Sequence, residues 1–188
     1  MTDFEDVFKD LRDHIEWLVA GSHPAYFGPE NALLKFGKCM TGVRDRPEYV
    51  PLGAKRQCYA NCAKTVLLSP PGREVLFYAE GFATQKDCRS IPMQHAWLVD
   101  PRGNIIDPTW EDANDHLYFG VIFRTAFVVE MLSVSNLEPG LLSAPTLMRR
   151  HFGSPALFEA TLDPLHHGAP ASLHRTEGVK VPTRSWNF

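Results

Sequence analysis

The sequence lacks a long apolar run and a cluster of basic residues, and both absences exclude broad classes of protein. No stretch approaches the roughly 18 apolar residues that a membrane-spanning helix requires. The 19 basic and 22 acidic residues give a formal charge of −3, and Lys and Arg form no run that would make a phosphate-binding stripe. We therefore expect neither a membrane nor a nucleic acid as partner.

Nucleotide-binding motifs and a targeting segment are also missing. Neither GxGxxG nor GxxxxGK[ST] occurs, so the sequence does not indicate a dinucleotide-binding or P-loop fold. Residues 1–20 are acidic and amphipathic, whereas a secretory signal has a basic region followed by an apolar one. On this ground we expect a cytoplasmic protein.

Cysteine is scarce, and its location matters more than its number. In a cytoplasmic chain of 188 residues free thiols are more expected than disulfides. This length, with 44% hydrophobic and 22% charged residues, predicts a single globular domain over 1–188. Many of the 15 prolines follow Gly140, so residues 140–188 are expected to form an irregular Pro- and Gly-containing C-terminal segment. The four cysteines are Cys39, Cys58, Cys62 and Cys88.

Hydrophobic periodicity predicts helices first and antiparallel strands afterwards, which is typical of an α+β fold. A long loop over 43–57 is expected to deliver the chain to a helix that opens at Cys58. Strand-like alternation on both sides of the turn sequence PRGN predicts a hairpin over 95–107. The expected helices are 3–20, 30–40, 59–68, 124–136, 146–152 and 155–162, and the expected strands are 74–83, 95–100, 105–107 and 118–123.

Three residues are placed for nucleophilic catalysis. The partial positive charge at a helix N-terminus favours a thiolate at Cys58, and the free N–H groups there suit a developing oxyanion. His95 opens one strand of the expected hairpin and Asp107 ends the other, so the two side chains should lie side by side. This order suggests Cys58 as nucleophile, His95 as general base and acid, and Asp107 as the group that orients the imidazole.

These segments resemble a known family. HAWLVDPRGNIIDPTW (95–110) is similar to the His and Asp segment of the transglutaminase-like branch of the papain-like cysteine enzymes, at its His-Ala-Trp and Asp-Pro-Thr positions. RQCYANCAKTVLL (56–68) resembles the helix that carries the family's cysteine, although Gln57 stands where the family usually has Gly. The resemblance covers residues 56–110.

The resemblance implies a papain-like, transglutaminase-like core, with the cysteine helix packed on an antiparallel sheet that carries His and Asp. It also implies cleavage of an amide bond, peptide, isopeptide or similar, in a protein or a small molecule. A thioester acyl-enzyme would form on Cys58 and be resolved by water or by an amine. Such chemistry needs no metal and no organic cofactor.

Four neighbouring residues are candidates for the walls of the site. Trp97 and Trp110 either enclose the His–Asp pair or are ordinary core residues. Gln57 and Gln94 directly precede proposed catalytic residues, and a side-chain amide can donate to an oxyanion. Neither matches the papain-type glutamine, which lies six residues before the cysteine, where this chain has Leu52.

Other interpretations of the same residues stay open. Cys62 lies one turn further along the same helical face and is the rival nucleophile, whereas Cys39 and Cys88 are expected to be structural. A zinc site formed by Cys58, Cys62, Cys88 and His95 is less favoured, because it has only one closely spaced ligand pair.

Two further segments and a second functional class complete the predictions. The acidic loop 111–116 suits a solvated turn better than a calcium loop, and His166, His167 and His174 are expected at the surface. The alternative to an enzyme is a non-catalytic binding or inhibitor module on the same fold. The substrate, the choice between hydrolysis and acyl transfer, and the oligomeric state are not specified by the sequence.

Overall fold

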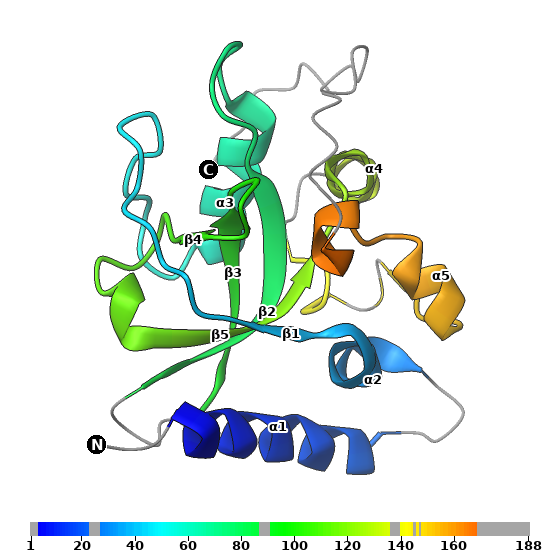
Figure 1. The fold of residues 1–188 in the computed structure, drawn as a ribbon. Helices are drawn as coiled ribbons and strands as arrows, with labels where there is room; N and C mark the ends of the chain where they lie inside the picture. The colour runs from blue at the N-terminus through cyan, green and yellow to red at the C-terminus, as the bar shows by residue number, and fades with distance from the viewer. Residues whose placement is uncertain are drawn as a thin grey trace.

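A curled antiparallel sheet of five strands forms the centre of the fold (Figure 1). The computed structural model describes residues 4–22, 27–86, 91–135, 140–144, 146 and 148–168. The strand order is β1-β5-β2-β3-β4, and every adjacent pair runs antiparallel. The strands are β1 (Lys38–Met40), β2 (Phe77–Gln85), β3 (Met93–Val99), β4 (Ile105–Ile106) and β5 (His116–Ile122). The α+β fold class is confirmed.

Helices cover this sheet, and most of them lie where the periodicity predicts. Helix α3 packs against β2 and β3, and α4 packs against β2 and α3, while α2 lies between α1 and β5. The α-helices are α1 (Phe4–Ala20), α2 (Gly28–Phe36), α3 (Cys58–Leu68), α4 (Thr125–Val134) and α5 (Pro155–Glu159), and short 3-10 helices cover Ala113–Asp115 (η1) and Pro164–His167 (η2).

Two of the expected helices were wrong in part. The helix expected over 30–40 ends at Phe36, because Gly37 leaves the helical conformation, and residues 38–40 pair with β5 as a strand. A Cβ atom at Gly37 would lie 2.6 Å from the ring of Phe119, so the chain turns there in close contact with the sheet. The described residues of 146–152 form turns rather than a helix.

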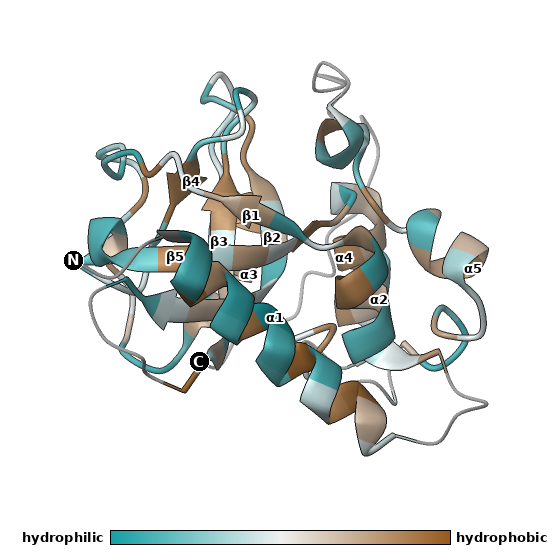
Figure 2. Cartoon of the chain, turned by 60° about the horizontal axis from the view of Figure 1, so that its bottom comes forward, coloured by the Kyte–Doolittle hydropathy of each residue, from teal (hydrophilic) through white to brown (hydrophobic). Residues whose placement is uncertain are grey.

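Alternation along the strands gives the sheet two different faces. One face packs beneath the helices and carries Tyr78, Phe82 and Leu98, while the other carries Trp97, Val99 and Tyr118 in a second cluster. In Figure 2 the side of α1 turned to the viewer is largely hydrophilic, whereas the strands beyond it are largely hydrophobic.

The C-terminal segment is part of the core through residue 168. Its described residues form no helix longer than α5, yet they contribute apolar side chains to the cluster beneath the helices and pair with the end of β5 through an isolated bridge between Phe123 and Leu162. Its buried members of that cluster are Leu141, Leu142, Met148, Phe152, Phe158 and Leu162.

His166 is buried, so its expected place at the surface was wrong. Its Nε2–H donates to the carbonyl of Phe36 at 2.7 Å, and its Nδ1 accepts from the N–H of Ile122 at 3.4 Å. Burial lowers the pKa of His166 to about 4. His167 is exposed as expected, and His174 lies outside the described residues.

Among the described helices, none has both the length and the apolar character needed to cross a membrane.

Candidate active site

The β3–β4 hairpin brings His95 and Asp107 into direct contact. Nε2 of His95 lies 2.7 Å from Oδ2 of Asp107, and both side chains are buried. The register pairs Leu98 with Ile106 and Val99 with Ile105, so the residues that flank these pairs approach each other across the strand ends. The juxtaposition of imidazole and carboxylate expected from the hairpin is therefore present.

Four hydrogen bonds saturate the Asp107 carboxylate. Oδ1 accepts from the backbone N–H groups of Thr109 (2.7 Å) and Trp110 (3.1 Å), and Oδ2 accepts from the Tyr118 hydroxyl (2.9 Å) as well as from His95. Burial raises the pKa of Asp107, but the hydrogen bonds and the charge of His95 outweigh it and hold the pKa below its ordinary value. The carboxylate is therefore ionised and can only accept, so Nε2 of His95 carries the proton.

A stack of aromatic rings fixes the imidazole. The ring of Trp110 lies 3.7 Å from that of His95 with only 5° between their planes, and the ring of His116 also stacks on Trp110, at 4.2 Å. Nδ1 of His116 is bonded to the carbonyl of Asp112 at 3.0 Å. Trp110 thus stacks on the imidazole of the His–Asp pair, and its role as a wall of an active site stays a prediction.

Cys58 begins α3 and meets the sheet beside His95. The backbone N–H groups of Ala96 and Tyr59 lie near its sulfur and act to lower the pKa of the thiol, and the side chain is 8% exposed. Within the described residues no hydrogen bond joins this sulfur to His95. The thiol therefore contacts the backbone next to the imidazole rather than the imidazole itself.

The expected stabilisation of the thiolate at Cys58 by backbone N–H groups is present but is outweighed by burial. Burial raises the pKa of the thiol, and the charges of Glu80 and Asp107 raise it further. The two N–H groups oppose these effects without reversing them, because withdrawing the sulfur from water costs more than two neutral donors return. The resting group is a thiol, which needs a base to become a nucleophile.

Cys62 is a poor alternative nucleophile. Its side chain is completely buried, and burial raises the pKa of its thiol well above the ordinary value. Cys39 is half-buried with a pKa raised by burial to about 11. Cys88 lies outside the described residues.

The remaining predicted site residues fall into two groups. Gln57 and Gln94 are both exposed, and Gln57 makes no side-chain cap to α3. Trp97 is fully buried in the second cluster, where its Nε1 has no hydrogen-bond partner. Trp97 is thus a core residue on the face that His95 shares.

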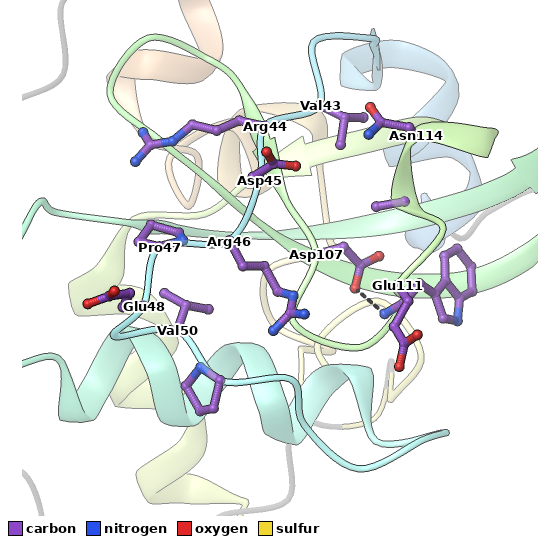
Figure 3. Close-up of a pocket in the computed structure, with 13 residues that line it drawn as sticks. Val43, Arg44, Asp45, Arg46, Pro47, Glu48, Val50, Asp107, Glu111 and Asn114 are labelled. Atoms are coloured by element: carbon purple, nitrogen blue, oxygen red, sulfur yellow. Dashed lines mark hydrogen bonds between the residues drawn. The ribbon is translucent and has the colours of Figure 1, made fainter.

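A cleft of about 420 Å³ reaches the acid–base pair from the side of Asp107. It lies between residues 43–51 and residues 107–114, and Asp107 and Trp110 belong to its lining (Figure 3). The side chains of Arg46 and Glu111 extend into it from opposite loops. Cys58 and His95 do not line this cleft.

Comparisons with known proteins were made against family models, curated proteins and solved structures. None of the three gives a match. The function must therefore be argued from the chemistry of the site itself.

No metal site is formed by the part of the chain that the structure describes. There, no group of three His, Cys, Asp or Glu side chains is placed to hold an ion. The proposed zinc ligands Cys58, Cys62 and His95 are not grouped in this way, and the fourth, Cys88, lies outside this part. The acidic loop 111–116 contains the η1 turn and the first residue of β5.

Sequence reasoning missed several residues that organise the site. Tyr118 donates to Asp107, and Nδ2 of Asn61 on α3 donates to Thr109 Oγ1 and to the carbonyl of Ala54, each at 2.9 Å. Asn61 thus ties the cysteine helix to the Asp-Pro-Thr segment. The polar side chain of Asn61 between two cysteines on a buried helical face was the signal available in the sequence.

Proposed function

We propose that the chain is a cysteine-dependent hydrolase or acyltransferase that cleaves an amide bond, on a transglutaminase-like, papain-like core. One observation carries the proposal. An imidazole oriented by a saturated carboxylate lies directly beside the residue whose N–H contacts the sulfur at the start of a helix. This combination supplies a nucleophile, a base and an orienting group within one contact region.

The proposed mechanism follows from the tautomer of His95. Because Nε2–H is held by Asp107, Nδ1 is the nitrogen that takes the proton from Cys58. The thiolate then attacks the substrate carbonyl, and the oxyanion is received by N–H groups at the first turn of α3, with the amide of Gln57 as a further candidate donor. Nδ1–H protonates the leaving amine, and a thioester remains on Cys58. Water or an amine, deprotonated by Nδ1, resolves it.

The reaction requires the thiol and the imidazole to form a hydrogen bond that the structure does not contain among its described residues. Catalytic hydrogen bonds are often long before substrate binds, and rotation of the Cys58 side chain changes the distance without moving the backbone. Since burial keeps the resting sulfur protonated, proton transfer to His95 is the step that generates the nucleophile.

Alkylation of the folded protein with iodoacetamide at neutral pH tests the assignment. We expect Cys58 to be labelled first, as located by peptide mass spectrometry, and His95→Gln to slow labelling by about 100-fold because the base is lost. Cys39→Ala is the matched control and should label as the wild type does. Preferential labelling of Cys62, or equal rates with and without His95, would contradict the proposal.

A second candidate is a binding module that keeps the fold as a scaffold. The low exposure of Cys58 and its raised pKa favour this candidate. It predicts that Cys58 stays unlabelled in the native protein over hours and reacts only after unfolding. The enzyme proposal predicts labelling well before unfolding, so one time course separates the two.

A further inference from the structure

Glu80 is a buried carboxylate in the middle of β2, outside the Cys58, His95 and Asp107 constellation. It is 1% exposed, and it accepts four hydrogen bonds. Oε2 accepts from the N–H of Leu141 (2.7 Å) and the hydroxyl of Tyr78 (2.9 Å). Oε1 accepts from the N–H groups of Leu142 (2.8 Å) and Ser143 (3.1 Å).

Three consecutive backbone N–H groups thus converge on one side chain from more than sixty positions away along the chain. Residues 140–143, here called the strap, belong to no helix or strand, and Gly140 has a φ of 105°. A buried carboxylate is costly unless every oxygen is bonded, and burial raises the pKa of Glu80 accordingly. An apolar residue would serve the core at lower cost, so the carboxylate calls for another explanation.

The strap leads from Glu80 to the residue after the nucleophile. The Ser143 side chain is hydrogen-bonded to the phenol of Tyr59. A Cβ atom at Gly140 would lie 3.6 Å from the Tyr59 ring, which shows how closely the strap follows that ring. Tyr59 in turn directs its backbone N–H at the sulfur of Cys58.

Glu80 also lies opposite the second donor to the sulfur. The register of β2 and β3 pairs Glu80 with Ala96, the residue whose N–H contacts Cys58. Both N–H groups that hold the sulfur therefore belong to residues adjoining Glu80 or its strap. Ala96 is paired with Glu80 across β2 and β3, and Tyr59 contacts the strap that Glu80 binds.

We propose that Glu80 is a positioning residue for the nucleophile, because by holding the strap against Tyr59 it fixes the backbone N–H groups that contact the Cys58 sulfur. The proposal rests on the proposed function only in taking Cys58 as the nucleophile. Glu80 does not touch the reacting atoms.

Two effects of Glu80 on the sulfur have opposite sign and can be measured apart. The charge of Glu80 disfavours the thiolate, as the charge of Asp107 does. Its hydrogen bonds to the strap, by contrast, orient the N–H groups near the sulfur, which favour a negative charge there. The titratable groups around Cys58 are Glu80 and Tyr78 from β2, His95 and Asp107 from the hairpin, and Tyr59 and Cys62 from α3.

The test compares Glu80→Gln, Ser143→Ala and Tyr78→Phe in the full chain. The rate of Cys58 alkylation by iodoacetamide is followed against pH, and the burst of acylation by p-nitrophenyl acetate is measured at matched thiolate fractions. Alkylation reports ionisation of the sulfur alone. Acylation also requires N–H groups placed for the oxyanion.

For Glu80→Gln we expect the alkylation midpoint to fall by about one pH unit through loss of charge, while acylation slows about tenfold through loss of position. Ser143→Ala keeps the charge and cuts the link to Tyr59, so acylation should slow with no fall in the midpoint. Tyr78→Phe keeps the three strap bonds and removes only the phenol bond to Glu80, so acylation should slow less than in Glu80→Gln.

The proposal would be overturned if Glu80→Gln changed neither the pH midpoint of alkylation nor the acylation rate. If Glu80→Gln does not fold, a wild-type acylation rate in Ser143→Ala would overturn it instead. Failure of the proposed function looks different. In that case the wild type shows no acylation burst that depends on His95, whereas the Glu80→Gln shift of the alkylation midpoint is still observed.

Discussion

At the scale of single residues, the buried carboxylates of Asp107 and Glu80 show how hydrogen-bond partners and burial together set the direction of a pKa shift. Asp107 has His95, Tyr118 and two N–H groups, and its pKa is lowered despite burial. Glu80 accepts from four neutral donors, and burial raises its pKa. The balance between burial and hydrogen bonding therefore differs between the two acids, because the bonds and His95 outweigh burial at Asp107, whereas the bonds to Glu80 do not.

His166 should control how stability depends on pH between about 6.5 and 4. Its ordinary pKa of 6.5 falls to about 4 in the fold, so acid protonates the unfolded chain before the folded one. The stabilisation is complete above 6.5 and decreases as the pH falls toward 4, by up to about 3 kcal/mol. We expect His166→Gln to flatten the pH dependence of urea unfolding in this window.

His167→Gln is the matched control for that measurement, because the neighbouring His167 is exposed. Asp107 acts in a different window, since its lowered pKa makes its contribution decline only as the pH falls below its ordinary value of 3.8. Parallel slopes for His166→Gln and the wild type would contradict the role of His166.

At the scale of elements, a pair of glycines lets β2 and β5 approach beside the site. Gly81 and Gly120 face each other in the register of the two strands. A Cβ atom at Gly120 would lie 2.4 Å from the carbonyl oxygen of Glu80 and 2.6 Å from the ring of Trp97. The absence of side chains at this point thus makes room for the core on the His95 face.

Gly120→Ala should destabilise the protein by about 2–3 kcal/mol, because backbone as well as a packed ring must move to admit the methyl group. Urea unfolding monitored by circular dichroism measures the change. Gly21→Ala is the control, since its Cβ would come no nearer than 3.6 Å to another residue, and it should change stability by less than about 0.5 kcal/mol. Equal effects of the two substitutions would contradict this account.

The sequence predicted those elements whose signals are local. Alternation and the PRGN turn were enough for the β3–β4 hairpin, and hence for the contact of His95 with Asp107. Strand β1 was missed because three residues after a glycine carry no periodicity and become a strand only by pairing with β5. Long-range partners were missed for the same reason.

The strap and the pKa of Cys58 could not be predicted, because both depend on residues that are far apart in the sequence. Glu80 interrupts a run of apolar residues in a predicted strand, which signals an unusual buried group, but nothing in the sequence identifies Leu141–Ser143 as its partners. Likewise, the helix start at Cys58 was predicted, whereas the degree of burial that raises its pKa is a property of the packed whole.

At the scale of the whole molecule, the C-terminal segment closes the core. Phe158 on α5 packs its ring against those of Phe36, Phe123 and Phe152 at centroid distances of 5.7, 6.1 and 5.5 Å. These partners come from α2, the end of β5 and the segment itself. The cluster therefore joins parts of the chain that are far apart in the sequence.

Phe158→Ala should lower the free energy of unfolding by about 3–5 kcal/mol, because a fully buried ring is lost from this cluster. Thermal and urea unfolding measure the loss. Leu157→Ala on the same helix is the control, since Leu157 is 51% exposed, and it should have a much smaller effect. A small effect at Phe158 would mean that the segment contributes little to the core.

The candidate site combines two elements, since His95 and Asp107 belong to one hairpin and the sulfur belongs to a helix that packs on the sheet. The N–H of Ala96 lies near the sulfur where the two elements meet. In evolutionary terms, a change of core volume beneath α3 can shift the thiol relative to the imidazole while all three residues remain. Descendants of such a chain would keep the fold and all three side chains yet lose the activity proposed above.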